Sequence, residues 1–228
     1  MRLYPHMTVD VPFLAGGVAL LWLPRSWMRL GVSFGPWRHR RHHHGQRGPV
    51  NESGLDARRE FARAHNYYDF ARAALGTLAL LVAFGGGGEG PLGHLAGTQA
   101  RDPLLVQAAI LGVAVLVQTI SWPRGRMTLA APVFFLAGAT IAFHLPVAGV
   151  CAFAMAWIMS PVVPNAQGFL VVQTVVLCVL GAVLHGLNLA TMISVGLCFL
   201  PVFLSLLARR PLLVLSRHAL NGRSGVQA

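Results

Sequence analysis

The chain has 228 residues, of which 55% are hydrophobic and 11% are charged, and its formal net charge is +11. This balance excludes an ordinary soluble domain, in which about a quarter of the residues are charged. All 18 basic residues are arginine, and no nucleic-acid-binding module accompanies them, so we expect the positive charge to meet anionic lipid headgroups and no nucleic acid.

The first apolar run extends from Val11 to Leu23 and ends at Pro24. One arginine, Arg2, precedes it, whereas a signal peptide carries its positive charge before the apolar run and small residues at a cleavage site after it. The arginines that follow are Arg25, Arg29, Arg38, Arg40 and Arg41. The positive-inside rule therefore predicts an uncleaved membrane segment, residues 1–24, with its N-terminus outside. Because the run is short, a tilted or re-entrant segment is the alternative.

Residues 25–54 are predicted to form a basic linker on the cytoplasmic face of the membrane. Apolar and aromatic side chains alternate with arginines there, as in segments that lie on a bilayer. The residues expected to contact lipid headgroups are Arg25, Arg29, Arg38, Arg40, Arg41, Trp27 and Trp37. Four histidines between His39 and His44 have no cysteine or carboxylate close in sequence, so we favour a flexible basic segment and expect no metal site.

Helical periodicity begins at Leu55 and continues to Phe84, where four glycines follow. This pattern predicts one helix over 55–84, with an amphipathic cytoplasmic half and a second half that enters the membrane as a span. Asp69 and Arg72 have the i,i+3 spacing of an oppositely charged pair on one helix face. Arg72 is expected to reach back to the membrane interface.

Residues 85–102 are predicted to form an outer glycine-rich loop. From Pro103 to Ala208 the only charged side chains are Arg124 and Arg126, which share one turn. Such a stretch suits a bilayer, whose hydrocarbon core is about 30 Å thick and takes about 20 helical residues per crossing. We expect a five-span bundle over 103–208 and a basic cytoplasmic tail over 209–228. The predicted segments are 103–121, 128–144, 146–160, 169–184 and 189–207.

The stretch 128–160 decides the orientation. Split at Pro146 into two segments, it places the Arg124/Arg126 turn and the basic tail on the same, cytoplasmic side. A re-entrant pair would satisfy the same parity. The sequence thus predicts an all-α polytopic transmembrane helix bundle of seven spans, or six if the first segment does not cross, with the N-terminus outside and the C-terminus cytoplasmic.

Polar residues within the predicted spans are few, and no carboxylate falls at mid-span. Carboxylate-coupled transport is therefore disfavoured, because ion-coupled transporters use acidic groups at membrane depth. Three glutamines, Gln107, Gln118 and Gln173, are expected to form hydrogen bonds between helices. The candidate polar-site residues are Asp56, Arg59, Glu60, Arg63, Asp69, His144, His185 and Asn188. For the histidines, a side chain at a helix end is favoured over a shared proton or ligand site.

Small residues at four-residue spacing predict close helix packing. Ala148, Ala152 and Ala156 form such a face, which Ser160 continues. Further pairs are Ala108–Gly112, Gly138–Ala142 and Ala182–Gly186.

The functional prediction is a bacterial cytoplasmic (inner) membrane protein without a catalytic site or cofactor. We expect an accessory, assembly or structural subunit of a larger membrane complex, whose partners are membrane lipids and other membrane subunits. The first alternative is a small-solute or lipid transporter. The second is a lipid-headgroup-modifying enzyme that uses carboxylates and arginines of the helix at 56–72.

Overall fold

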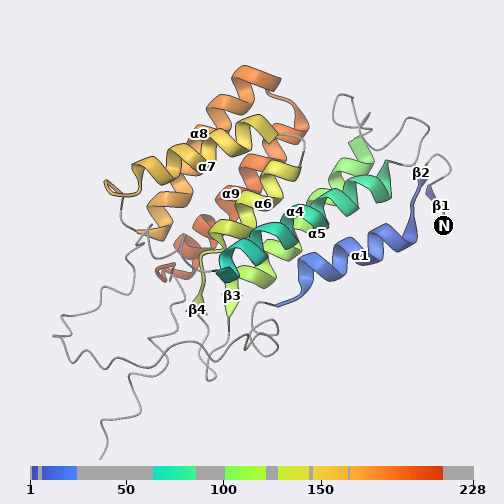
Figure 1. Ribbon diagram of the computed structural model, residues 1–228, viewed down its shortest axis with the longest axis horizontal. Helices are drawn as coiled ribbons and strands as arrows, with labels where there is room; N and C mark the ends of the chain where they lie inside the picture. Colours follow the sequence, from blue (N-terminus) through green and yellow to red (C-terminus); the bar gives the residue numbers. More distant parts are fainter. Residues whose placement is uncertain are drawn as a thin grey trace, which may run out of the picture.

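The computed structural model describes residues 2–4, 7–24, 64–85, 101–121, 128–143, 146–163 and 165–212. Seven helices lie within these residues, as the sequence predicts for an all-helical fold (Figure 1). They are α1 (Val11–Trp22), α4 (Ala64–Phe84), α5 (Arg101–Thr119), α6 (Val133–Ala142), α7 (Pro146–Met159), α8 (Ala166–His185) and α9 (Leu189–Ala208).

Two short antiparallel strand pairs accompany the helices. β1 (Arg2–Tyr4) pairs with β2 (Met7–Thr8) directly before α1, and β3 (Ile120–Ser121) pairs with β4 (Thr128–Leu129) between α5 and α6. The second pair is extended by a hydrogen bond from the Ala130 amide to the Thr119 carbonyl, at 2.7 Å. It brings the end of α5 next to the start of α6.

Four of the helices, α4, α5, α8 and α9, are long and apolar enough to cross a membrane. At 1.5 Å per residue, a 20-residue helix spans about 30 Å, the thickness of a hydrocarbon core. The other three, α1, α6 and α7, are apolar but shorter, at 10 to 14 residues. The described part of the chain is therefore helical and contains four candidate membrane spans.

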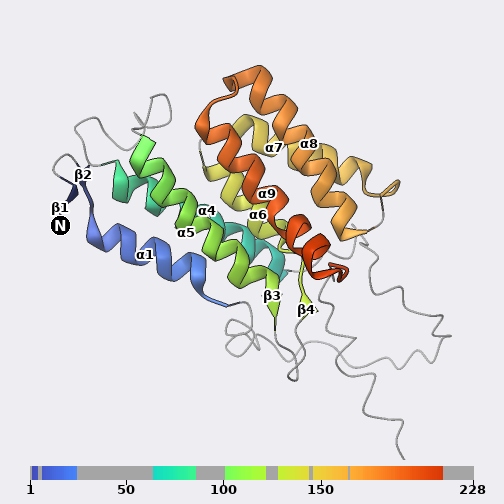
Figure 2. The same ribbon diagram turned by 180° about the vertical axis from the view of Figure 1, so that it is seen from behind.

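The helices contact one another in a closed ring. The order around the ring is α1, α4, α6, α7, α8, α9 and α5, and α5 returns to α1; further contacts join α6 to α9 and α4 to α5. Figures 1 and 2 show α1, α4 and α5 on one side of the molecule and α7 and α8 on the other. The short helix α6 is the most enclosed, with nine of its residues buried.

The predicted segment 128–144 begins as a strand, and its helix starts only at Val133. Pro132 explains the late start, because a proline pushes the residue before it out of the helical region and is itself tolerated at a helix start. The predicted division of 128–160 into two helices is confirmed, since Pro146 begins α7. The predicted linker 25–54, the predicted helical residues 55–63, most of the outer loop and most of the tail lie outside the described residues.

Glycine lets α6 approach α4. A Cβ atom on Gly138 would lie 2.2 Å from the carbonyl oxygen of Phe70 and 3.2 Å from the Cβ of Ala73. A contact that short with a backbone atom cannot be relieved by a side-chain rotation, so only glycine permits this spacing. Gly112 on α5 differs, because a Cβ there would meet nothing within 4 Å.

An aromatic cluster joins the helices on the other side of α6. Phe134 of α6 lies 5.8 Å from both Phe153 and Trp157 of α7, measured between ring centroids. Trp157 in turn lies 5.2 Å from Phe169 of α8, edge to face. Edge-to-face rings contribute roughly 0.5–1.5 kcal/mol beyond their buried area. Helix α6 thus packs on α4 through a close backbone contact and on α7 and α8 through aromatic rings.

Gly138→Ala is expected to destabilise the protein by about 1–3 kcal/mol, because the added methyl group forces α6 away from α4. The measurement is thermal unfolding in detergent micelles, followed by tryptophan fluorescence. Gly112→Ala is the matched control and should leave the midpoint unchanged or raise it slightly, since alanine favours a helix. Equal midpoints for the two variants would contradict the close approach at Gly138.

Candidate functional site

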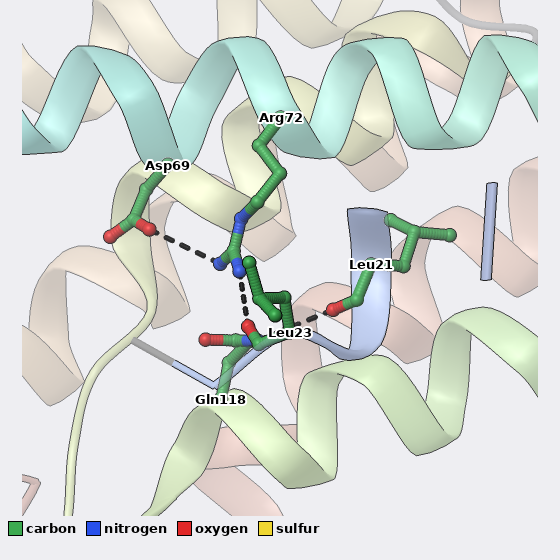
Figure 3. Close-up of polar contacts among 5 residues, drawn as sticks. All are labelled: Leu21, Leu23, Asp69, Arg72 and Gln118. Atoms are coloured by element: carbon green, nitrogen blue, oxygen red, sulfur yellow. Dashed lines mark hydrogen bonds and ion pairs between the residues drawn. The ribbon is translucent and has the colours of Figure 1, made fainter. Parts of the chain in front are cut away.

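Polar side chains from two helices converge on the end of α1. Asp69 and Arg72 come from α4, Gln118 comes from α5, and the carbonyl oxygens of Leu21 and Leu23 come from α1 (Figure 3). We call these five residues the α1 clamp. α1 ends here because Pro24 follows it and cannot continue the helix.

A buried ion pair forms the charged half of the α1 clamp. The Nη2 atom of Arg72 lies 3.1 Å from Oδ1 of Asp69, and both side chains are almost fully buried. The predicted i,i+3 pair is therefore confirmed. The guanidinium also makes a cation–π contact, because its central carbon lies 5.5 Å from the ring centroid of Phe135.

The expectation that Arg72 reaches back to the membrane interface stays a prediction. The residue is only 6% exposed and points towards α1. Asp69 compensates its charge inside the bundle, and the Leu23 carbonyl accepts a hydrogen bond from Nη1 of Arg72. A charged side chain that is paired and hydrogen-bonded in this way does not need the interface.

The amide half of the α1 clamp is Gln118. Its Nε2 atom donates to the Leu23 carbonyl at 3.0 Å and to the Leu21 carbonyl at 3.2 Å. The last four carbonyls of a helix have no partner inside the helix. In a low-dielectric environment such groups are costly when unpaired. Gln118 and Arg72 therefore complete the hydrogen bonding of α1 from outside the helix.

The three glutamines differ in outcome. Gln107 of α5 donates to the Leu80 carbonyl of α4 at 3.5 Å, and Gln118 donates to α1, so interhelical hydrogen bonding is confirmed for both. For Gln173 of α8 the expectation is wrong within the described part of the chain. Neither its amide nitrogen nor its oxygen has a hydrogen-bond partner there, although the residue is 0% exposed.

Asn188 and His185 lie at the turn between α8 and α9 and are exposed. The side-chain oxygen of Asn188 accepts a hydrogen bond from the Thr191 amide at 2.8 Å, and its Nδ2 donates to the His185 carbonyl at 3.2 Å. Asn188 is thus the N-cap of α9 and also binds the end of α8. This arrangement fixes the turn through the side chain that the sequence marks as a candidate ligand.

The alanine face of α7 is buried. Ala148, Ala152 and Ala156 are at most 1% exposed, and Ser160 is 4% exposed. Ala148 and Ala152 pack with Leu177 of α8 and Cys198 of α9. Small residues allow α7 to lie close against the last hairpin.

Most other candidate residues lie outside the described residues. They are Arg25, Arg29, Arg38, Arg40, Arg41, Trp27, Trp37, Asp56, Arg59, Glu60, Arg63 and His144. Within the described ranges, no group of three or more histidine, cysteine, aspartate or glutamate side chains is placed to hold a metal ion.

Side-chain patterns in the sequence do not predict the role of α1 in the site. The acceptors are main-chain carbonyls, which every residue carries, so no side-chain pattern marks them. A signal was nevertheless present, because a short apolar helix that ends at a proline leaves carbonyls in need of donors. Gln118 at the far end of the predicted 103–121 segment was the available donor.

Comparisons of the chain with protein-family models, with curated proteins and with solved structures gave no match. The site is therefore interpreted from its own geometry.

Arg72→Leu is expected to destabilise the protein by about 3–5 kcal/mol, because it leaves the Asp69 carboxylate buried without its guanidinium. Asp69→Leu should be similarly harmful, whereas the double variant Asp69→Leu/Arg72→Leu should lose much less than the sum of the two. Thermal unfolding in detergent measures this cycle. Arg209→Gln, at an exposed arginine after α9, serves as the control and should change little. Additive losses would show that the two side chains do not act as a pair.

Proposed function

We propose that this chain is an accessory, assembly or structural subunit of a larger complex in a bacterial cytoplasmic membrane. In this proposal all seven apolar helices are membrane segments, the N-terminus is outside and the C-terminus is cytoplasmic. The antiparallel contact of α1 with α4 supports it. The Asp10 amide, before α1, donates to the Ala83 carbonyl at the end of α4, whereas Leu23 at the end of α1 meets Arg72 near the start of α4.

The observation that carries the proposal is the use of buried polar groups. In the α1 clamp, the guanidinium and the amide both donate to main-chain carbonyls. Thr119, Thr140 and Thr174 likewise donate to carbonyls one turn earlier in their own helices. A catalytic or transport site would keep such groups available to a substrate. Because these groups instead form hydrogen bonds to main-chain carbonyls, they support a role in helix packing.

The short helices support a partner in the membrane. A 14-residue helix such as α7 spans about 21 Å, less than a hydrocarbon core of about 30 Å. Unlike α6, it carries exposed apolar side chains on its outer face. They include Val147, Val150, Met155 and Ile158, with exposed fractions from 48% to 74%. A protein neighbour on this face would cover the helix where lipid of normal thickness would not fit it.

The lipid-headgroup enzyme receives less support. Of its proposed acidic and basic residues, Asp69 lies in the described part, and it faces the bundle interior in contact with Arg72. A carboxylate held in a buried ion pair is poorly placed to bind a metal and a headgroup.

The test is purification of the tagged full-length chain in a mild detergent after cross-linking in native membranes. A stoichiometric partner is expected, and its recovery should fall several-fold in Val150→Trp, which disturbs the outer face of α7. Val179→Trp is the matched control, because Val179 is similarly exposed on α8, a helix long enough to cross alone. A chain that migrates without partners, or equal recovery from both variants, would contradict the proposal.

A small-solute transporter is the second candidate, and Gln173 is the observation in its favour. This amide is fully buried in a helix long enough to cross the membrane, and both of its polar atoms are without a partner among the described residues. An unsatisfied amide in an apolar bundle costs roughly 1–3 kcal/mol, which a hydrogen-bonding solute would offset.

Proteoliposome swelling with glycerol and with urea tests this candidate. A transporter should admit one of these neutral probes faster than empty liposomes do, and Gln173→Leu should abolish the difference. Gln107→Leu is the control, because Gln107 already donates to a main-chain carbonyl. Wild-type rates equal to those of empty liposomes would exclude a pathway for these solutes.

A further inference from the structure

The main chain turns sharply at the end of α9, and the residue at the turn is an arginine. Arg209 directly follows the helix and has a φ of 50° and a ψ of 37°, in the left-handed region. It is the only non-glycine residue with a positive φ in the part of the chain that the structure describes. Glycine is the usual residue at such a position, because a Cβ atom makes the left-handed conformation less stable. The presence of an arginine therefore needs a reason other than the turn itself.

The hydrogen bonds of the turn come from the main chain and from Ser205. The Arg209 amide donates to the Leu206 carbonyl at 3.2 Å. The Arg210 amide donates to the Ser205 carbonyl at 3.1 Å, and the Ser205 hydroxyl donates to the Arg210 carbonyl at 2.6 Å. Leu212, which is 2% exposed, then anchors the segment in the hydrophobic core. None of these contacts uses the guanidinium of Arg209.

That guanidinium is available to a ligand. The Arg209 side chain is exposed, and among the described residues it has no hydrogen-bond or ion-pair partner. The buried carboxylate Asp69 is paired with Arg72 instead. A guanidinium presents its N–H donors in a planar fork that matches the oxygens of a phosphate group. The chemistry of this position therefore suits a phosphate-bearing anion.

Exposed apolar side chains lie directly before this cation, on the last turns of α9 (Figure 2). Phe203, Leu206 and Leu207 are three and four residues apart, so they share one face of the helix, and they are 51% to 72% exposed. α9 is long enough to cross a hydrocarbon core. In a membrane that α9 crosses, the residue directly after the helix lies at the level of the headgroups. An apolar face and a phosphate-binding cation then meet at the boundary where a lipid has the same two parts.

We propose that Arg209, Phe203, Leu206 and Leu207 form a binding site for an anionic phospholipid. The guanidinium binds the headgroup phosphate, and the acyl chains lie along the apolar face of α9. A zwitterionic lipid binds less well, because its own cation competes with the guanidinium for the phosphate. The site rests on α9 crossing a membrane, as in the proposed function, but it needs no partner subunit. A chain without partners could therefore still bind the lipid, and the two proposals can fail separately.

Quenching of a fluorophore next to the site measures its lipid preference. The full-length chain, with Cys151, Cys178 and Cys198 replaced by alanine, is labelled with bimane at Ala208→Cys, an exposed position beside the site. It is reconstituted in phosphatidylcholine nanodiscs that contain a small fraction of brominated lipid, either phosphatidylglycerol or phosphatidylcholine. The control label is Met192→Cys, which is exposed near the start of the same helix.

We expect brominated phosphatidylglycerol to quench the label at residue 208 with a roughly fivefold higher apparent affinity than brominated phosphatidylcholine, the factor expected for one arginine at an anionic surface. Arg209→Gln should lower this ratio towards one. Arg209→Lys should retain part of it, since an ammonium group keeps the charge but lacks the planar fork. The label at residue 192 should give a ratio near one in every variant.

Arg209→Gly distinguishes a lipid site from a structural role of the arginine. Glycine suits the left-handed turn, so this variant should keep or raise the midpoint of thermal unfolding in detergent. It should nevertheless lose the preference for phosphatidylglycerol as Arg209→Gln does. A lower midpoint together with an unchanged quenching ratio would assign the side chain to the stability of the bundle and contradict the proposal.

Two further results would overturn the proposal. One is equal quenching by the two brominated lipids at residue 208 of the otherwise unchanged chain. The other is loss of the preference when inorganic phosphate is added at constant ionic strength, because the ligand of Arg209 would then be a soluble anion and the apolar face would contribute nothing to its binding.

Discussion

The structure depends on satisfying main-chain carbonyls where no water is available. Inside a helix each carbonyl has a partner, but the last turn has none, and in a bilayer these groups cannot turn to solvent. At the end of α1 the carbonyls accept hydrogen bonds from side chains of the neighbouring helices, Arg72 of α4 and Gln118 of α5. A buried cation then requires a buried anion, and Asp69 supplies it. One unsatisfied helix end thus accounts for the most polar cluster in the described bundle.

The rest of the bundle is assembled with almost no charge. α6 fits against α4 because Gly138 has no side chain, and it meets α7 and α8 through rings such as Phe134 and Trp157. α7 fits against α8 and α9 through alanines. Lipid tails are as apolar as these side chains, so burial alone gives little preference for helix over lipid, and close shape complementarity decides the arrangement.

The helices could be predicted from the sequence because apolar runs and prolines mark them directly. α8 and α9 differ from their predicted ranges by three residues or fewer, and Pro146 divides α6 from α7 as expected. The site was less predictable. The pairing of Asp69 with Arg72 follows from helical spacing, but its inward direction depends on where α1 ends. Likewise, Gly138 and Gly112 look alike in sequence, and only the approach of Phe70 distinguishes them.

The ring of contacts has a consequence for synthesis of the chain. α9 touches α5, α6 and α8, and it is the last of the described helices to leave the ribosome. Until α9 is made, the faces of α5, α6 and α8 that contact it stay uncovered. The buried side chains of α9 that later cover them include Cys198 and Val202. A chain interrupted before α9 would therefore leave one side of α5 and of α8 without a helix neighbour, while α4 would still hold α6.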